Sequence, residues 1–98
     1  MDDKKITVTT SSGFEYEVEA GALDDMEIFE DLMTIEDPDA SKPARMRATT
    51  RAFRKLIGPE QTERLEAFLR GRDGRVRISA YQKEILELFA SMNNGKKK

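Results

Sequence analysis

The sequence predicts an α+β fold in which an N-terminal β-hairpin packs on about four α-helices. Three observations lead to this expectation. Apolar and polar residues alternate with a period of two as far as Val18, whereas from residue 24 onward apolar residues recur at helical spacing. Glycine and proline punctuate the helical part at Pro38, Pro43 and Gly58-Pro59. Finally, 98 residues are enough for a single domain with one modest core.

Residues 1–22 are expected to form the hairpin. Two short segments show the alternation of strands that bury one face. Their apolar positions are Ile6, Val8, Phe14, Tyr16 and Val18. Residues 11–13 between the segments end in Gly13, which tolerates the positive φ of a tight turn. Because a lone hairpin is marginally stable in water, helices must cover its apolar face.

Residues 23–36 are expected to form an acidic helix. Asp24 is the predicted N-cap, with Glu27 three residues later as in a capping box. The apolar positions of this helix form a wide stripe: Met26, Ile28, Phe29, Leu32, Met33 and Ile35. The prolines and polar residues of segment 37–43 then predict a loop, the segment expected to be most mobile.

Residues 44–94 are expected to hold the remaining helices. The first runs from Ala44 to Ile57, and Gly58-Pro59 ends it and starts a second that continues to Arg70. The last runs from Ala80 to about Met92, with Ser79 as its N-cap. The lysines of segment 95–98 are expected to form a flexible tail.

The stretch RGRDGRVRIS, residues 70–79, admits three interpretations: a nucleic-acid contact, a calcium loop or a turn. A calcium loop centred on Gly74 would place Leu69, Gly71 and Ala80 at ligand positions, and none of them carries a carboxylate. We therefore prefer a turn at Asp73-Gly74 followed by a possible short strand at 75–78. Such a strand would turn Arg75 and Arg77 outward, where they could face glutamates of the hairpin.

Composition weighs against catalysis. The chain has no cysteine and no histidine, so it lacks thiolate ligands, the commonest metal ligand and the commonest general base. We therefore expect a protein that is not an enzyme, with no metal and no cofactor. No apolar run is long enough to cross a membrane, and MDDKKITV does not resemble a secretory signal, so a cytosolic chain is expected.

Charge is divided sharply between the two halves of the chain. Residues 1–40 carry 2 lysines and 13 acidic residues, a net charge of 2 − 13 = −11, whereas residues 41–98 carry 15 basic and 6 acidic residues, a net charge of 15 − 6 = +9. The basic face of segment 42–55 consists of Lys42, Arg45, Arg47, Arg51, Arg54 and Lys55. Such a face binds nucleic acid in some proteins, but here we favour a basic helix face lying opposite the acidic helix.

The order of these parts resembles a known family. The stretches ITVTTSSGFEYEVEAGALDDMEIFEDL, KLIGPEQTERLEAFL and DGRVRISAYQKEILELF look like the tail assembly chaperones of long-tailed bacteriophages and Gram-positive prophages. The likeness covers most of the chain and involves no catalytic signature. The basic segment from Lys42 to Lys55 departs from the family pattern.

The resemblance implies a chaperone that binds the helical tape measure protein, keeps it soluble and helps recruit the tail-tube protein. It further implies a location in the host bacterial cytoplasm and absence from the mature virion. Self-association is expected from the divided charge and from the repeated sites that a helical client offers. The predicted partner-binding residues, apolar as a client helix requires, are Met26, Phe29, Leu32, Met33, Leu86, Phe89 and Met92. The alternative function is a small nucleic-acid-binding regulator that uses the basic helix 42–55.

Overall fold

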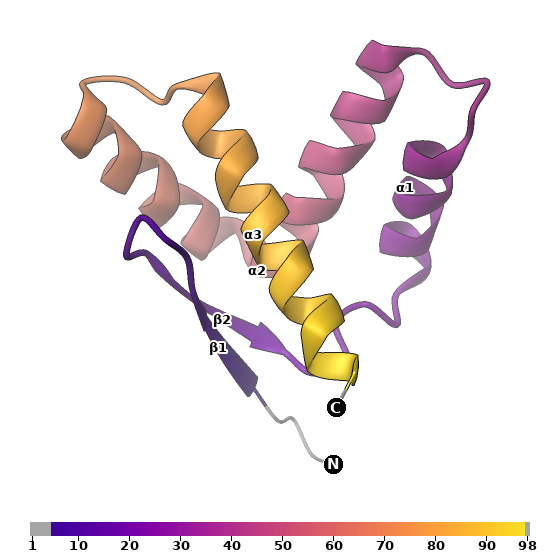
Figure 1. The fold of residues 1–98 in the computed structure, drawn as a ribbon, viewed down its shortest axis with the longest axis horizontal. Helices are drawn as coiled ribbons and strands as arrows, with labels where there is room; N and C mark the ends of the chain where they lie inside the picture. The colour runs from indigo at the N-terminus through magenta and orange to yellow at the C-terminus, as the bar shows by residue number, and fades with distance from the viewer. Residues whose placement is uncertain (1–4, 98) are drawn as a thin grey trace.

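A computed structural model describes the backbone of residues 5–97 and the side chains of residues 5–92. Within this range the fold is α+β, with one antiparallel hairpin and three helices (Figure 1). In chain order the elements are β1 (Lys5–Thr9), β2 (Glu15–Glu19), α1 (Met26–Glu36), α2 (Lys42–Asp73) and α3 (Ile78–Lys97). The predicted fold class is thus confirmed, although one of the expected helix breaks is a bend within α2.

The hairpin forms where the alternating pattern predicts it. Strand β1 pairs with β2 in a register that places Ile6 opposite Val18 and Val8 opposite Tyr16. Gly13 in the turn has a φ of 95°, a conformation that glycine adopts without strain. Val8, Tyr16 and Val18 are buried, whereas Ile6 remains exposed near the start of β1. One face of the hairpin therefore supplies part of the core.

Helix α1 begins one residue later than the sequence suggests. Asp25, and not Asp24, is the N-cap, because its carboxylate accepts hydrogen bonds from the backbone N–H groups of Glu27 at 2.8 Å and Ile28 at 3.3 Å. Two adjacent aspartates offer the same capping chemistry, and the sequence alone does not choose between them. The predicted position of the cap was wrong, but the acidic helix itself is confirmed.

Helix α2 joins the two middle helices that the sequence separates. It starts at Lys42, where a loop had been expected as far as residue 43, because the Ser41 side chain caps it and Pro43 fits its first turn. At Gly58 the backbone has φ 84° and ψ 164°, and the helix resumes at once with Pro59. The expected count of about four helices is therefore corrected to three, with α2 bent into arms 42–57 and 59–73 that form a V in Figure 1.

No strand forms at residues 75–78. Gly74 ends α2 in the left-handed conformation, with φ 81° and a backbone N–H that donates to the carbonyl of Arg70. Helix α3 then begins at Ile78, so Ser79 lies inside the helix and is not its cap. Without this strand, the cross-strand contacts expected for Arg75 and Arg77 are not formed. Helix α3 also continues through Lys97, past the expected start of the tail, and Lys98 lies outside the described residues.

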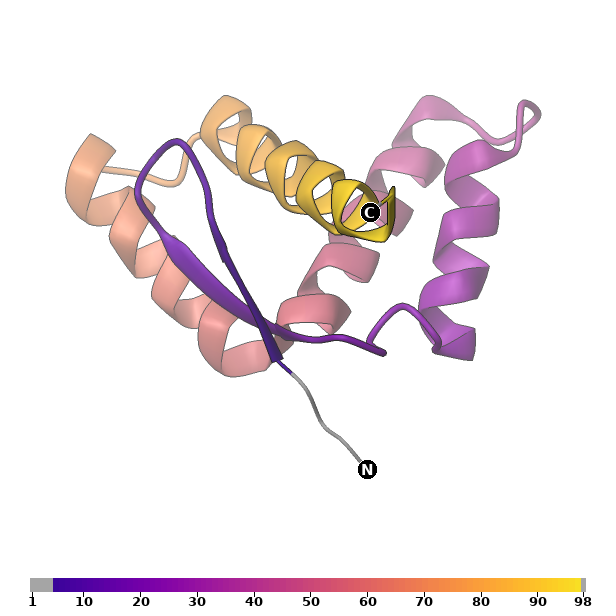
Figure 2. The same ribbon diagram turned by 60° about the horizontal axis from the view of Figure 1, so that its bottom comes forward.

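The core lies where the hairpin, α3 and the two arms of α2 meet. The hairpin runs along the second arm of α2, whereas α1 lies against the first arm (Figure 2). Edge-to-face aromatic contacts connect Tyr16 to Phe53 and Phe53 to Tyr81, with ring centroids 6.0 and 5.7 Å apart. Helix α1 packs on the first arm of α2 and contributes Ile28 to the core, but it leaves part of its surface uncovered.

Candidate functional site

Two carboxylates of α3 hold the hairpin in place. The buried Glu84 carboxylate accepts hydrogen bonds from the hydroxyls of Thr10 and Tyr16, each at 2.7 Å. One turn further along, Glu87 accepts the backbone N–H of Ser11 at 2.7 Å and its hydroxyl at 2.6 Å. Burial, and then the hydrogen bond to Glu84, raise the pKa of Tyr16 above its ordinary value, whereas the Ser11 hydrogen bonds lower the pKa of Glu87.

This network has a structural character. Among the described side chains, no buried nitrogen or oxygen atom lacks a hydrogen-bond partner. The hydroxyls of Thr10 and Tyr16 and the carboxylate of Glu84 therefore satisfy one another within the fold. Sequence reasoning missed this role for Glu84, because its position on α3 does not reveal which hydroxyls the hairpin brings to it.

Gln61 connects the bend of α2 to the outer edge of β2. Its side-chain oxygen accepts the backbone N–H of Glu17 at 2.7 Å, and its side-chain nitrogen donates to the carbonyl of Glu17 at 2.8 Å. The same nitrogen donates to the carbonyl of Ile57 at 2.7 Å. A single amide thus satisfies backbone groups at the bend and at the strand edge.

An ion-pair cluster joins α1 to the first arm of α2. Asp31 is only 4% exposed, and its carboxylate accepts hydrogen bonds from Arg51 at 2.8 and 3.0 Å and from Lys55 at 3.2 Å. Lys55 also lies 3.7 Å from the Glu27 carboxylate. Burial alone would raise the pKa of Asp31, but the hydrogen bonds from the two cations more than offset it and hold this pKa below its ordinary value.

The predicted basic face is therefore divided. Arg51 and Lys55 pair with the acidic helix, as the favoured interpretation of the sequence requires. Arg54 donates to the Tyr81 hydroxyl at 3.2 Å, lies 3.4 Å from Glu66, and places its guanidinium over the Tyr81 ring. The other members, Lys42, Arg45 and Arg47, form no ion pair with a side chain in the range 5–92.

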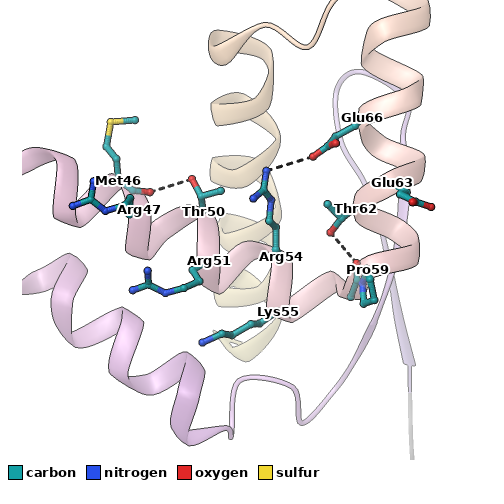
Figure 3. A pocket seen from close by; sticks show the side chains of 11 residues that line it. Met46, Arg47, Thr50, Arg51, Arg54, Lys55, Pro59, Thr62, Glu63 and Glu66 are labelled. Carbon is teal, nitrogen blue, oxygen red and sulfur yellow. Dashed lines mark hydrogen bonds and ion pairs between the residues drawn. The ribbon is translucent and has the colours of Figure 1, made fainter.

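A wide depression of about 1000 Å³ lies between the arms of α2 (Figure 3). Basic side chains from the first arm line one side, and Glu63 and Glu66 from the second arm line the other. Arg54 reaches across toward Glu66, as Figure 3 shows. Because opposite charges face each other here, the depression is a poor match for a uniformly anionic ligand. No group of three metal-ligating side chains occurs in the described part of the chain.

Exposed apolar side chains gather on one face of α1. Met26 is 66% exposed, Phe29 51% and Met33 57%. Their spacing of three and four residues places them side by side along the helix. We call these three residues the α1 stripe. The exposed acids Glu30 and Glu36 border it, so the stripe is an apolar surface with an acidic rim.

The other predicted partner-binding residues divide into three groups. Leu86 on α3 is 70% exposed, away from the α1 stripe in sequence and on a different helix. Leu32 and Phe89 are half-buried and pack against the core. Met92 is buried within the core, which removes it from the predicted surface. The apolar side chains of an amphipathic helix look alike in sequence, and only the packing of neighbouring elements separates core from surface.

A second apolar feature lies between α2 and α3. A notch of about 190 Å³ is lined by Met46, Thr49, Thr50, Gln82, Ile85 and Leu86. Met46 is exposed at its edge, and sequence reasoning overlooked this residue because it lies among the basic residues of segment 42–55. Met46 precedes Thr49 by three residues and Phe53 by seven, and this helical spacing is the signal that could have placed Met46 on the same helix face.

No family model matches the chain, and no curated protein or solved structure matches it either. Among the helices that the structure describes, none has the length and apolar character needed to span a bilayer.

Proposed function

We propose that the protein is a tail assembly chaperone that binds an amphipathic helix of a tape measure protein, keeps that client soluble and helps recruit the tail-tube protein. The observation that carries the proposal is the α1 stripe, a row of three large apolar side chains left uncovered on a short helix. Rows of methionine and aromatic side chains suit the binding of helical partners of varied sequence. The chain acts in this proposal as a binding protein without catalysis.

The energetics favour a client that offers many sites. Fully burying a Met or Phe side chain contributes about 1.5–3 kcal/mol, so covering the exposed half of the α1 stripe contributes roughly 2–5 kcal/mol before the costs of association. One such contact alone is weak. A long helical client that repeats the contact along its length, with several chaperones bound, gains through effective concentration. The acidic rim favours client helices with Lys or Arg beside their apolar face.

Co-expression of the chain with a tape measure fragment tests this function. We expect the wild-type chain to raise the soluble fraction of the fragment, and Phe29→Asp or Met33→Asp to abolish the effect, because each places a charge in the α1 stripe. Ile78→Asp is the matched control, since Ile78 is an exposed apolar residue at the start of α3 and does not belong to the α1 stripe. Circular dichroism checks that each variant is folded. A folded Phe29→Asp variant that still solubilises the fragment would refute the assignment of this surface.

The alternative function, nucleic-acid binding by the basic face, receives less support. Arg51, Arg54 and Lys55 are engaged in intramolecular ion pairs and would have to exchange them for phosphate contacts. Binding that involved the remaining cations would weaken steeply with salt, as counterion release demands. Duplex binding with such a salt dependence, measured by fluorescence anisotropy, would favour the regulator over the chaperone.

A further inference from the structure

We propose that the notch between α2 and α3 receives the α1 stripe of a second copy of this chain, so that copies associate head to tail. The two surfaces are different patches of the same chain, one apolar with an acidic rim and one apolar with basic neighbours. This inference does not rest on the proposed function, because it concerns only how the chain meets itself.

The notch has the size and lining for one large apolar side chain. Its volume of about 190 Å³ exceeds the roughly 150 Å³ of an apolar protein cavity that accepts benzene. Met46 and Leu86 stand exposed at its edges, and Ile85 supplies the buried wall. A phenyl ring such as that of Phe29, which is half-exposed in the stripe, fits a space of this kind.

Charge complementarity identifies the second copy as the occupant. Lys42 precedes Met46 by one helical turn and Lys83 lies one turn before Leu86, while Glu87, the acid next to Leu86, is already bonded to Ser11, so cations predominate around the notch. The α1 stripe is bordered by Glu30 and Glu36. Docking the stripe in the notch would therefore bring acidic residues of one copy to basic residues of the other.

A chain cannot fill its own notch with its own α1 in this fold. At about 100° per residue, Met46 lies roughly 140° around α2 from Arg51 and roughly 180° from Lys55. Arg51 and Lys55 contact Asp31 of α1, so α1 lies on the side of α2 facing away from Met46. Because the stripe and the notch are different patches, the contact between two copies is heterologous. A row of such contacts continues as an open chain of copies unless the rotation between neighbouring copies closes a ring.

The experiment uses one variant for each surface. Phe29→Asp destroys the stripe and leaves the notch, whereas Leu86→Asp destroys the notch and leaves the stripe. We expect the wild-type chain to form oligomers at high protein concentration in low salt, and each variant alone to sediment as a monomer. An equimolar mixture should form a dimer and nothing larger, because it retains a single complementary pair of surfaces. High salt should weaken both the wild-type oligomers and the mixed dimer.

Other outcomes would overturn the proposal. A wild-type chain that stays monomeric, a variant that still forms wild-type oligomers, or a mixture that remains monomeric each contradicts it. The second result would indicate either a symmetric contact made by one patch on itself or capture of a different helix by the notch, because the variant that retains that patch would still associate. Both substituted side chains are at least half exposed, so the fold should persist. Met33→Asp and Met46→Asp form an independent second pair, and circular dichroism verifies the fold of all four variants.

Client binding and self-association are separable by these variants. Leu86→Asp leaves the α1 stripe intact, so if both proposals hold it should still solubilise the tape measure fragment while failing to oligomerise. If the proposed function is wrong but the contact exists, the mixing experiment succeeds and the solubility assay fails for every variant and for the wild-type chain.

Discussion

Replacing Asp31 by asparagine tests whether the charge on this residue holds α1 against α2. Asp31→Asn keeps the size of the side chain and one carbonyl oxygen, but removes the negative charge that Arg51 and Lys55 share. A hydrogen bond to a charged group contributes about 1.5–3 kcal/mol. Breaking a fully buried ion pair costs about 3–5 kcal/mol, because an uncompensated charge stays buried.

The partial exposure of the two cations places the expected loss of unfolding free energy below the range for a fully buried ion pair. The side chains of Arg51 and Lys55 are 53% and 31% exposed, so both cations can turn to water when the carboxylate is lost. The asparagine oxygen still accepts one hydrogen bond. We therefore expect Asp31→Asn to lower the free energy of unfolding by about 2 kcal/mol at neutral pH, measured by urea denaturation. Glu30→Gln, an exposed carboxylate on the same helix, is the control and should change stability by less than about 0.5 kcal/mol.

The lowered pKa of Asp31 decides in which direction the stability difference between the wild-type chain and Asp31→Asn changes with pH. Because the pKa of Asp31 in the folded protein lies below its ordinary value of 3.8, the ionised form is stabilised by folding. Its contribution is fully present above the ordinary value and is lost as the pH falls through the lowered folded value. The difference between the wild-type chain and Asp31→Asn should therefore shrink in acid. A difference below about 0.5 kcal/mol at neutral pH, or one that does not shrink in acid, would refute this reasoning.

Two further substitutions test the bend of α2 and the hairpin anchor. Gly58→Ala should destabilise the fold by about 1–3 kcal/mol through backbone strain alone, because a Cβ at Gly58 meets no atom within 4 Å. Gly71→Ala, within the regular helix, should instead be neutral or stabilising by up to about 1 kcal/mol, and equal effects at the two sites would contradict the role of the bend. Tyr16→Phe removes one of the two hydrogen bonds to buried Glu84 and should cost about 1.5–3 kcal/mol in urea denaturation. An unchanged midpoint for Tyr16→Phe would mean that Thr10 alone satisfies the carboxylate.

The elements with strong local signals were predictable from the sequence. The alternation of Val8, Tyr16 and Val18 defined the buried face of the hairpin, because a period of two has one structural meaning. The glycine at position 58 was correctly seen as a break in helix direction. Pro59 opens the second arm as expected, because proline needs no hydrogen-bond partner in a first turn, and only the helix count changes, since the two arms form one bent helix.

The features that depend on distant parts of the chain were not predictable. Val76 and Ile78 suggested a strand, but a strand forms only beside a partner, and α3 begins at Ile78 without one. For the candidate site, Met26, Phe29 and Met33 were correctly placed on one face of a helix. Which apolar residues remain exposed is decided by how many elements the chain has to cover them, and helix periodicity does not contain that information.

The amide of Gln61 has a consequence for the behaviour of the chain at high concentration. A two-stranded sheet leaves unpaired backbone groups along both margins, and such margins can recruit a strand from another molecule. On β2, the outward N–H and carbonyl of Glu17 are both occupied by Gln61, in the geometry that an added strand would use. An incoming strand would have to displace this amide and the bend of α2 behind it. A single glutamine thereby protects this margin of β2 against amyloid-like growth.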